Sequence, residues 1–111
     1  MLTRDEIALV DDLPFRIMHV KEWGGDIKVR AMSTIARIAF ENRNLECKNE
    51  LETMVCLIMH SCVDDNNNRV FIDSDFDLLA KKSAKVLMEI FQIAIELSTL
   101  SNKEVEEKVK N

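Results

Sequence analysis

Residues 21–30 read Lys-Glu-Trp-Gly-Gly-Asp-Ile-Lys-Val-Arg and contain the chain's only tryptophan, Trp23, and its only two glycines, Gly24 and Gly25. A Gly-Gly pair between two segments that can alternate is typical of a β-hairpin, because its tight turns need positive φ angles that glycine adopts without strain. With Gly24 and Gly25 as structural turn residues, we expect antiparallel strands over residues 15–22 and 26–31. No other stretch predicts a sheet as clearly.

A turn centred on the two glycines places Trp23 opposite Asp26 and Val20 opposite Val29. Side chains alternate between the faces of a strand, so this register separates an apolar face from a charged one. The apolar face would carry Met18, Val20, Ile27, Val29 and Ala31. Trp23 falls on the charged face, where it is either left beside lysines or covered by another helix; the second alternative is favoured because tryptophan is usually well buried.

Length and composition indicate one folded, helix-rich domain. The chain has 111 residues, of which 47% are hydrophobic and 32% charged, with one proline and no extended low-complexity linker. The formal net charge of -5 argues against binding to nucleic acid or to anionic membranes. Three cysteines, an odd number, together with the lack of a signal peptide or a membrane-spanning run, favour a reducing cytoplasm.

Capping patterns and apolar periodicity predict the helices. They place helices over residues 3–12, 33–42, 45–63, 75–82, 84–100 and 101–111. The expected fold is mainly α, with about five or six helices and one two-stranded antiparallel β-hairpin near the N-terminus. We expect residues 1–111 to form a single domain: an N-terminal helix and hairpin at 1–32, a helical core at 33–100 and a polar C-terminal helix at 101–111.

Three of these helices carry apolar stripes at helical spacing. In the first, Ile35, Ile38 and Ala39 are expected to face the core, with Phe40 beside them. The other two stripes are wider. The helix at 45–63 presents Leu51, Val55, Ile58 and Cys62 with Met54, Leu57 and Met59, and the helix at 84–100 presents Val86, Ile90, Ile93, Leu97 and Leu100. A methionine-rich stripe is either ordinary core or a surface that adapts to partner helices.

No chemistry-bearing site emerges from the side chains. Cys56, His60 and Cys62 have partial zinc-ligand spacing but no second ligand pair, and ordinary packing is favoured. Residues 64–75 begin like a calcium loop, yet Arg69 stands where the loop needs glycine and Asp75 where it needs a bidentate glutamate. A polar turn is the simpler interpretation. With neither a phosphate-binding loop nor a catalytic triad pattern, we expect no metal, no cofactor and no enzymatic activity.

The order of these features resembles the small tail assembly chaperones of long-tailed bacteriophages and prophages. The resemblance runs from the short helix ending Asp-Asp-Leu-Pro at residues 11–14, through Glu-Trp-Gly-Gly at 22–25 and the strand at 27–30, to the helix opened by Ser33. It continues downstream from Phe71 to the Leu-Ser pair at 100–101. Members of that family often have proline where this chain has Lys21.

The resemblance implies a non-enzymatic protein of the host cytoplasm that binds the tape measure protein and helps recruit tail tube subunits. Such a chaperone is expected to be absent from the mature virion. The partner-binding candidates in this chain are Trp23, Met54, Ile58, Met59, Ile90, Ile93 and Leu97, and polar replacements of Ile90 and Ile93 are predicted to weaken binding. The wide apolar helix permits a homo-oligomer, although a well-packed monomer explains the same pattern.

Other protein classes remain as alternatives. One is a structural head-tail or tail completion protein of a phage, which would be found in purified virions. Another is a small helical protein-interaction module. A helix-turn-helix regulator is disfavoured because the chain has neither a basic recognition helix nor a positive net charge.

Overall fold

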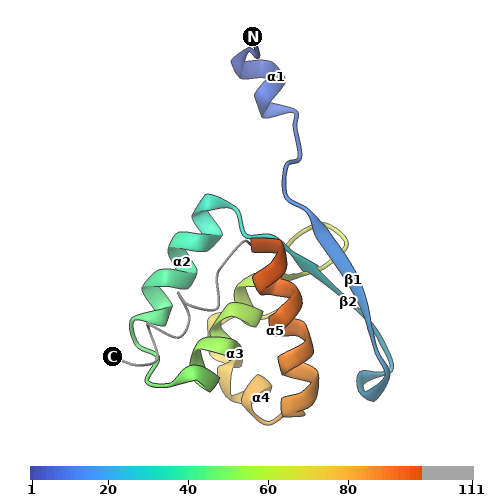
Figure 1. The fold of residues 1–111 in the computed structure, drawn as a ribbon, viewed down its shortest axis with the longest axis vertical. Helices are drawn as coiled ribbons and strands as arrows, with labels where there is room; N and C mark the ends of the chain where they lie inside the picture. The colour runs from blue at the N-terminus through green and yellow to red at the C-terminus, as the bar shows by residue number, and fades with distance from the viewer. Residues whose placement is uncertain (99–111) are drawn as a thin grey trace.

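A computed structural model describes residues 1–98 and arranges them as a group of helices, α2 to α5, beside a small sheet, with α1 projecting away from both (Figure 1). The helices are α1 (Arg4–Ala8), α2 (Thr34–Asn44), α3 (Glu50–Ser61), α4 (Phe76–Ala80) and α5 (Ala84–Ser98), with 3₁₀ turns at Lys21–Trp23 and Asp73–Asp75. The strands are β1 (Phe15–Val20), β2 (Gly25–Arg30) and β3 (Cys62–Val63). The polar helix predicted over residues 101–111, and Leu100, lie outside the described residues.

The described residues form a mixed α/β fold, so the expected mainly α fold with a two-stranded hairpin is wrong. β3 pairs antiparallel with β2, which gives a three-stranded sheet in the order β1-β2-β3. The third strand is only two residues long and follows α3 directly. It escaped prediction because Cys62 continues the helical spacing of α3 and so looks like one more turn of that helix.

The hairpin forms where expected, but its predicted register is wrong. Val20 lies opposite Gly25 and Met18 opposite Ile27, because the 3₁₀ turn Lys21–Trp23 supplies the connection. Gly24 ends that turn with a φ of 73°, the conformation that favours glycine, while Gly25 already belongs to β2. The observed register differs from the predicted one by an even number of residues, so the strand side chains stay on the faces of the hairpin that were predicted for them.

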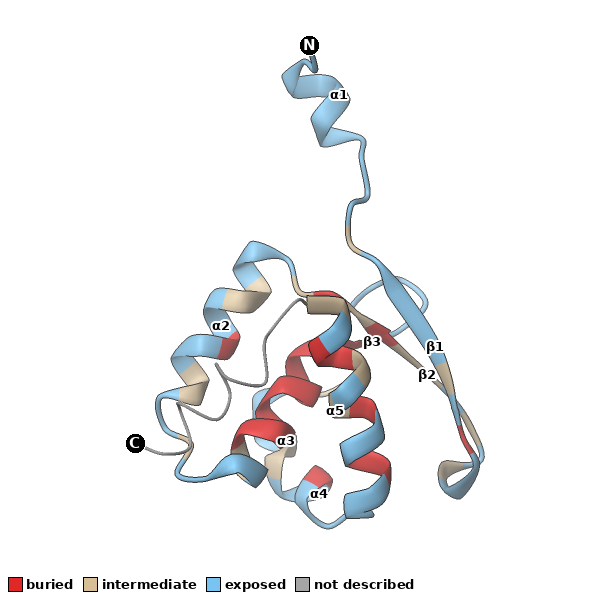
Figure 2. Cartoon of the chain, in the orientation of Figure 1, coloured by how far each residue is buried: buried red, intermediate tan, exposed pale blue. Residues whose placement is uncertain are grey.

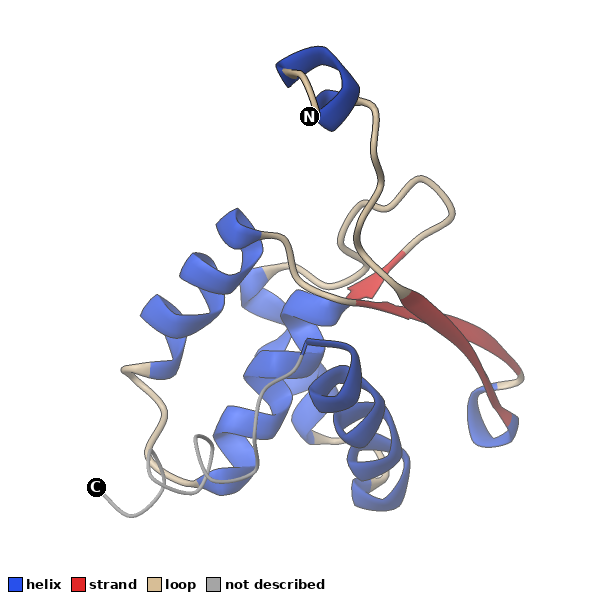
Figure 3. Ribbon diagram, turned by 45° about the horizontal axis from the view of Figure 1, so that its top comes forward, coloured by secondary structure: helices blue, strands red, loops and turns tan. Residues whose placement is uncertain are grey.

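The centre of the core is α3, whose residues 53–61 are all buried (Figure 2). Helices α2, α4 and α5 pack around it, and α5 also contacts β1 and β2, so α5 lies between α3 and the sheet (Figure 3). The start of α3 is set by Asn49, whose Oδ1 accepts a hydrogen bond from the Glu52 amide at 2.9 Å and whose Nδ2 donates to the Glu52 carboxylate at 3.0 Å. This cap explains why the helix begins at Glu50, later than predicted.

The orientation of α2 differs most from expectation. Phe40 is its one buried residue, at 4% exposed, whereas Ile35 is 82% and Ile38 56% exposed and Ala39 is also on the surface. The prediction that the isoleucines face the core is therefore wrong. Phe40 makes an edge-on ring contact with the buried His60 of α3, and this single large anchor turns the isoleucine face outward.

Candidate protein-binding surface

The seven predicted partner-binding side chains lie in or against the core. Met54 is 5% exposed, and Ile58, Met59 and Ile90 are completely buried. Trp23, Ile93 and Leu97 are partly buried and pack against the core cluster. The first four side chains therefore offer almost no accessible surface in this conformation. Their part in partner binding stays a prediction, and exposed residues are better candidates for a first contact.

Trp23 lies in the turn that connects β1 to β2 and not on the charged face of the hairpin. It is the last residue of the 3₁₀ turn and packs against the core cluster while keeping part of its surface exposed. This placement agrees with the alternative in which the body of the protein covers the indole. A half-buried tryptophan also makes a useful fluorescence reporter for this part of the fold.

The most regular exposed apolar surface in the described residues is on α2. It consists of Ile35, Ile38 and Ala39, which we call the α2 stripe. These positions have the i, i+3, i+4 spacing of one helical face, and all three side chains are exposed. The periodicity of the sequence identified this stripe, but the stripe was predicted to face the core and is instead exposed. Periodicity shows that one face of a helix is apolar, and it does not show what covers that face.

A surface hollow of about 260 Å³ lies at the N-terminal end of the α2 stripe, where α2 meets the end of α5. Its lining residues are Met32, Ser33, Thr34, Arg37, Ile38 and Ser98. The Ser33 hydroxyl accepts a hydrogen bond from the Ala36 amide at 3.1 Å, and the Met32 amide donates to the Ser98 hydroxyl at 3.4 Å. The hollow thus combines apolar side chains with polar groups that take part in hydrogen bonds.

A second exposed apolar segment is the N-terminal arm, residues 1–13, which extends away from the body (Figure 1). The sequence Thr-Arg-Asp-Glu at residues 3–6 predicts a capping box, and the structure confirms it: the Thr3 hydroxyl accepts a hydrogen bond from the Glu6 amide and the Glu6 carboxylate accepts one from the Thr3 amide, both at 3.2 Å. The helix ends at Ala8, earlier than predicted, and buries none of its residues. The exposed large apolar residues of the arm are Met1, Leu2, Ile7, Leu9 and Val10.

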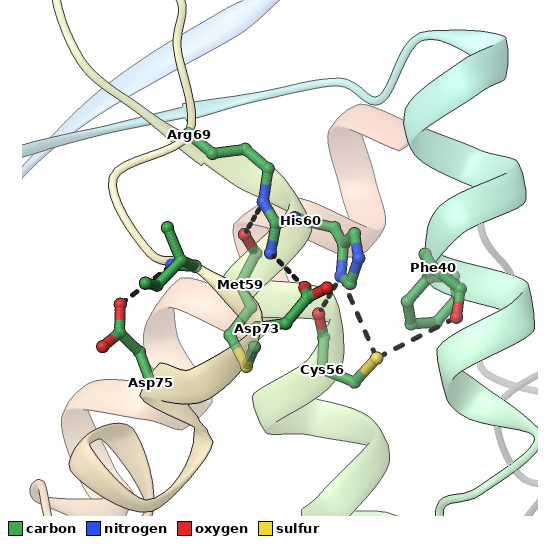
Figure 4. Close-up of polar contacts among 8 residues, drawn as sticks. Phe40, Cys56, Met59, His60, Arg69, Asp73 and Asp75 are labelled. Atoms are coloured by element: carbon green, nitrogen blue, oxygen red, sulfur yellow. Dashed lines mark hydrogen bonds and ion pairs between the residues drawn. The ribbon is translucent and has the colours of Figure 1, made fainter.

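The buried end of α3 holds a small polar cluster (Figure 4). The His60 Nδ1 donates to the Cys56 carbonyl at 2.8 Å, which fixes the proton on that ring nitrogen. Burial is the main cause that lowers the pKa of His60, and burial raises the pKa of Cys56 to about 12. Both side chains are therefore neutral at pH 7. A protonated thiol beside a neutral imidazole is a packing arrangement, not an activated nucleophile.

Arg69 connects the loop that follows β3 to the end of α3 (Figure 4). Its Nε donates to the Met59 carbonyl at 3.0 Å, and its Nη2 forms an ion pair with Asp73 at 3.2 Å. The Met59 carbonyl lies in the last turn of α3, where carbonyls lack helical partners. Arg69, which stands at the position where a calcium loop has glycine, thus has a structural role: it links the loop to the end of α3.

The loop before Arg69 is built as a turn. Asp64 Oδ1 accepts hydrogen bonds from the amides of Asn66 at 2.8 Å and Asn68 at 3.0 Å, so this carboxylate oxygen is committed to the backbone. Asn67 takes a positive φ of 65°. Within residues 1–98 no three His, Cys, Asp or Glu side chains converge as metal ligands.

Comparisons with known proteins agree with one another. A family model described as phage tail assembly chaperone matches residues 4–110. The tail assembly chaperone of bacteriophage HK97 has the same fold, with a TM-score of 0.61 at 17% identity over 84% of this chain and 94% of that one. A search of curated proteins found no match. Over the part that the structure describes, no helix is long and apolar enough to cross a membrane. Because the family model spans nearly the whole sequence, the chain belongs to the phage tail assembly chaperone family.

Proposed function

We propose that this protein binds the tape measure protein during phage tail assembly and helps to recruit tail tube subunits, without catalysing a reaction. The observation that carries the proposal is the α2 stripe: an apolar helical face with no cover among the described residues, in a family of tail assembly chaperones. We further propose that it acts in the host cytoplasm and is absent from the finished virion.

The geometry of the α2 stripe suits a helical partner. Ile35, Ile38 and Ala39 offer a short ridge, and an amphipathic helix can pack its own i, i+3, i+4 ridge beside it. The hollow next to Ile38 gives one partner side chain a place to insert. On the flank, Arg37 and Glu41 form an ion pair at 2.9 Å, which supplies the polar border that an apolar contact needs for specificity.

A chaperone that bridges two partners needs a second surface. The outward face of the hairpin carries Phe15 and Ile17, which are 53% and 59% exposed, and it does not overlap the α2 stripe. Lys28 lies over the Phe15 ring, 4.3 Å from its centroid, so this face is apolar with a charged border. We assign contact with tail tube subunits to this face.

The proposal is tested by measuring the affinity of the purified protein for the tape measure protein of its phage. Ile35→Asp and Ile38→Asp place charges on the contact and are expected to weaken binding at least about tenfold each. Leu78→Asp is the matched control, because Leu78 is a large exposed side chain on α4, at 48% exposed. Circular dichroism checks that all three variants are folded.

Two results would overturn the proposal. Folded Ile35→Asp and Ile38→Asp variants that bind the tape measure protein as tightly as the original chain would exclude the α2 stripe. Detection of this protein in purified virions by mass spectrometry would instead support the structural head-tail or tail completion alternative.

A further inference from the structure

β1 is an outer strand of the sheet, and one of its edges has no partner strand. The sheet order β1-β2-β3 gives β2 a neighbour on both sides and leaves β1 with β2 alone (Figure 2). The Ala31 amide donates to the Pro14 carbonyl at 2.8 Å, so these two residues form a hydrogen-bonded pair. Bonded and non-bonded pairs alternate along an antiparallel ladder. The N–H and C=O groups of Phe15, Ile17 and His19 therefore point away from β2, toward the open edge of β1.

This open edge lacks the features that usually prevent a strand from pairing with another chain. β1 contains no proline, and its ladder with β2 runs over the whole strand without a bulge. Its one arginine, Arg16, forms an ion pair with Glu96 of α5 at 2.9 Å, and His19 contacts Asp26 of β2 at 2.8 Å. Within residues 1–98, no side chain or loop forms a hydrogen bond to the outward backbone groups of β1. The edge is thus available to a further strand.

The hairpin is the basic part of an acidic protein. Residues 15–30 carry two carboxylates, Glu22 and Asp26, against four basic side chains, Arg16, Lys21, Lys28 and Arg30. The whole chain, by contrast, has a formal net charge of -5. A strand that adds to β1 is therefore favoured by carboxylates of its own. The same charges oppose pairing with the hairpin of a second copy, because two basic hairpins would then lie side by side.

Phe15 and Ile17 determine which side chains suit the added strand. They are two positions apart on the outward face of β1, and each is more than half exposed. Side chains opposite each other on neighbouring strands are in contact, and successive side chains of a strand alternate between its faces. Apolar residues at every second position of the partner therefore cover both side chains.

We propose that β1 accepts an extended segment of the tail tube subunit as an additional strand of the sheet. This segment has apolar side chains at alternate positions and carries carboxylates. Its backbone bonds to the outward groups of Phe15, Ile17 and His19, which supplies affinity, while the apolar side chains and the charges supply specificity. The inference rests on the proposed contact between the hairpin and tail tube subunits, and it adds the way in which that contact is made.

Amide hydrogen exchange tests the strand addition, measured by NMR on the full-length protein with and without the purified tail tube protein. The amides of Arg16 and Met18 face β2 and should be protected already in the free protein. The amides of Phe15, Ile17 and His19 should exchange rapidly in the free protein and at least about tenfold more slowly in the complex. Unchanged exchange of these three amides in the presence of bound tail tube protein would overturn the proposal. Their protection in the protein alone, increasing with its concentration, would also overturn it, because it would show pairing between copies.

A pair of variants at one position separates the backbone from the side chain. Ile17→Pro removes an outward N–H group and no bond to β2, and edge strands tolerate proline at such positions. It should weaken binding of the tail tube protein at least about tenfold. Ile17→Ala is the matched control, because it shortens the side chain and keeps the amide, and it should weaken binding less. Circular dichroism and Trp23 fluorescence check that both variants are folded.

The outcomes distinguish this inference from the proposed function. Equal weakening by Ile17→Pro and Ile17→Ala would overturn strand addition, because the side chain alone would then account for the contact. The same holds if the tail tube protein binds the hairpin without protecting the outward amides, and in that case the proposed function stands. If the full-length protein binds no tail tube protein at all, both the proposed recruitment and the strand addition fail.

Discussion

Ile90 and Ile35 look equivalent in the sequence, since both lie on apolar helical stripes, but the structure gives them opposite environments. Ile90 on α5 is 0% exposed and Ile35 on α2 is 82% exposed. We predict that Ile90→Ala strongly lowers the free energy of unfolding, while Ile35→Ala leaves it nearly unchanged.

The magnitudes follow from burial. Shortening isoleucine to alanine removes about three carbon groups at about 0.8 kcal/mol each, or about 2.4 kcal/mol of lost transfer free energy when they are fully buried. The cavity left behind at Ile90 raises the cost to about 3–4 kcal/mol, within the usual ~2–5 kcal/mol for this change. At Ile35 only about a fifth of the side chain is buried, so the loss is about 0.4 kcal/mol, which the better helix propensity of alanine offsets.

Urea denaturation followed by Trp23 fluorescence and far-UV circular dichroism measures both free energies. With a slope of about 1.5 kcal/mol/M, Ile90→Ala should lower the midpoint by about 2 M at unchanged slope, and Ile35→Ala should leave it unchanged. The reasoning would be refuted if Ile35→Ala cost more than about 1.5 kcal/mol, or if Ile90→Ala cost less than about 1 kcal/mol.

Two further predictions concern the buried histidine and the hairpin turn. Burial lowers the pKa of His60 in the folded state, so unfolding takes up a proton as the pH falls below the ordinary value of 6.5, and the free energy of unfolding should decrease there. Urea midpoints at pH 7.5 and below 6 should show this fall, and His60→Gln should reduce it. Gly24→Ala should lower the free energy of unfolding by about 1–2 kcal/mol, because Gly24 has a φ of +73°. Gly25→Ala should lower it by less than about 1 kcal/mol, because Gly25 has open space around it and no positive φ. Equal losses for the two variants would show that the turn does not adopt this conformation.

Features that depend on neighbouring residues could be predicted from the sequence. The capping box of Thr3 formed as expected, and the Ser33 and Ser83 hydroxyls accept hydrogen bonds from the amides of Ala36 and Val86 at the starts of α2 and α5. These bonds join residues three positions apart, so the local sequence contains both partners. The position of the hairpin was predictable for the same reason.

Features that depend on distant residues could not be predicted. Cys62 and Val63 form a third strand because they pair with the edge of β2, and β2 is far from them in the sequence. The contact of Phe40 with His60 determines which face of α2 is turned toward the core. The spacing of Ile35 and Ile38 gives no information about that contact. The partner-binding candidates were chosen from the widest stripes, and the structure buries Met54, Ile58, Met59 and Ile90 there, while their part in partner binding stays a prediction.

The pairing of β3 with β2 also bears on the order in which the chain folds. The hairpin closes a short loop and can form by itself, but its third strand is separated from it by all of α2 and α3. Closing that long loop has an entropic cost that only the packing of the helices offsets. We therefore expect the sheet to be completed after the helices have collapsed onto one another, so that pairing of β3 with β2 marks the last stage of folding.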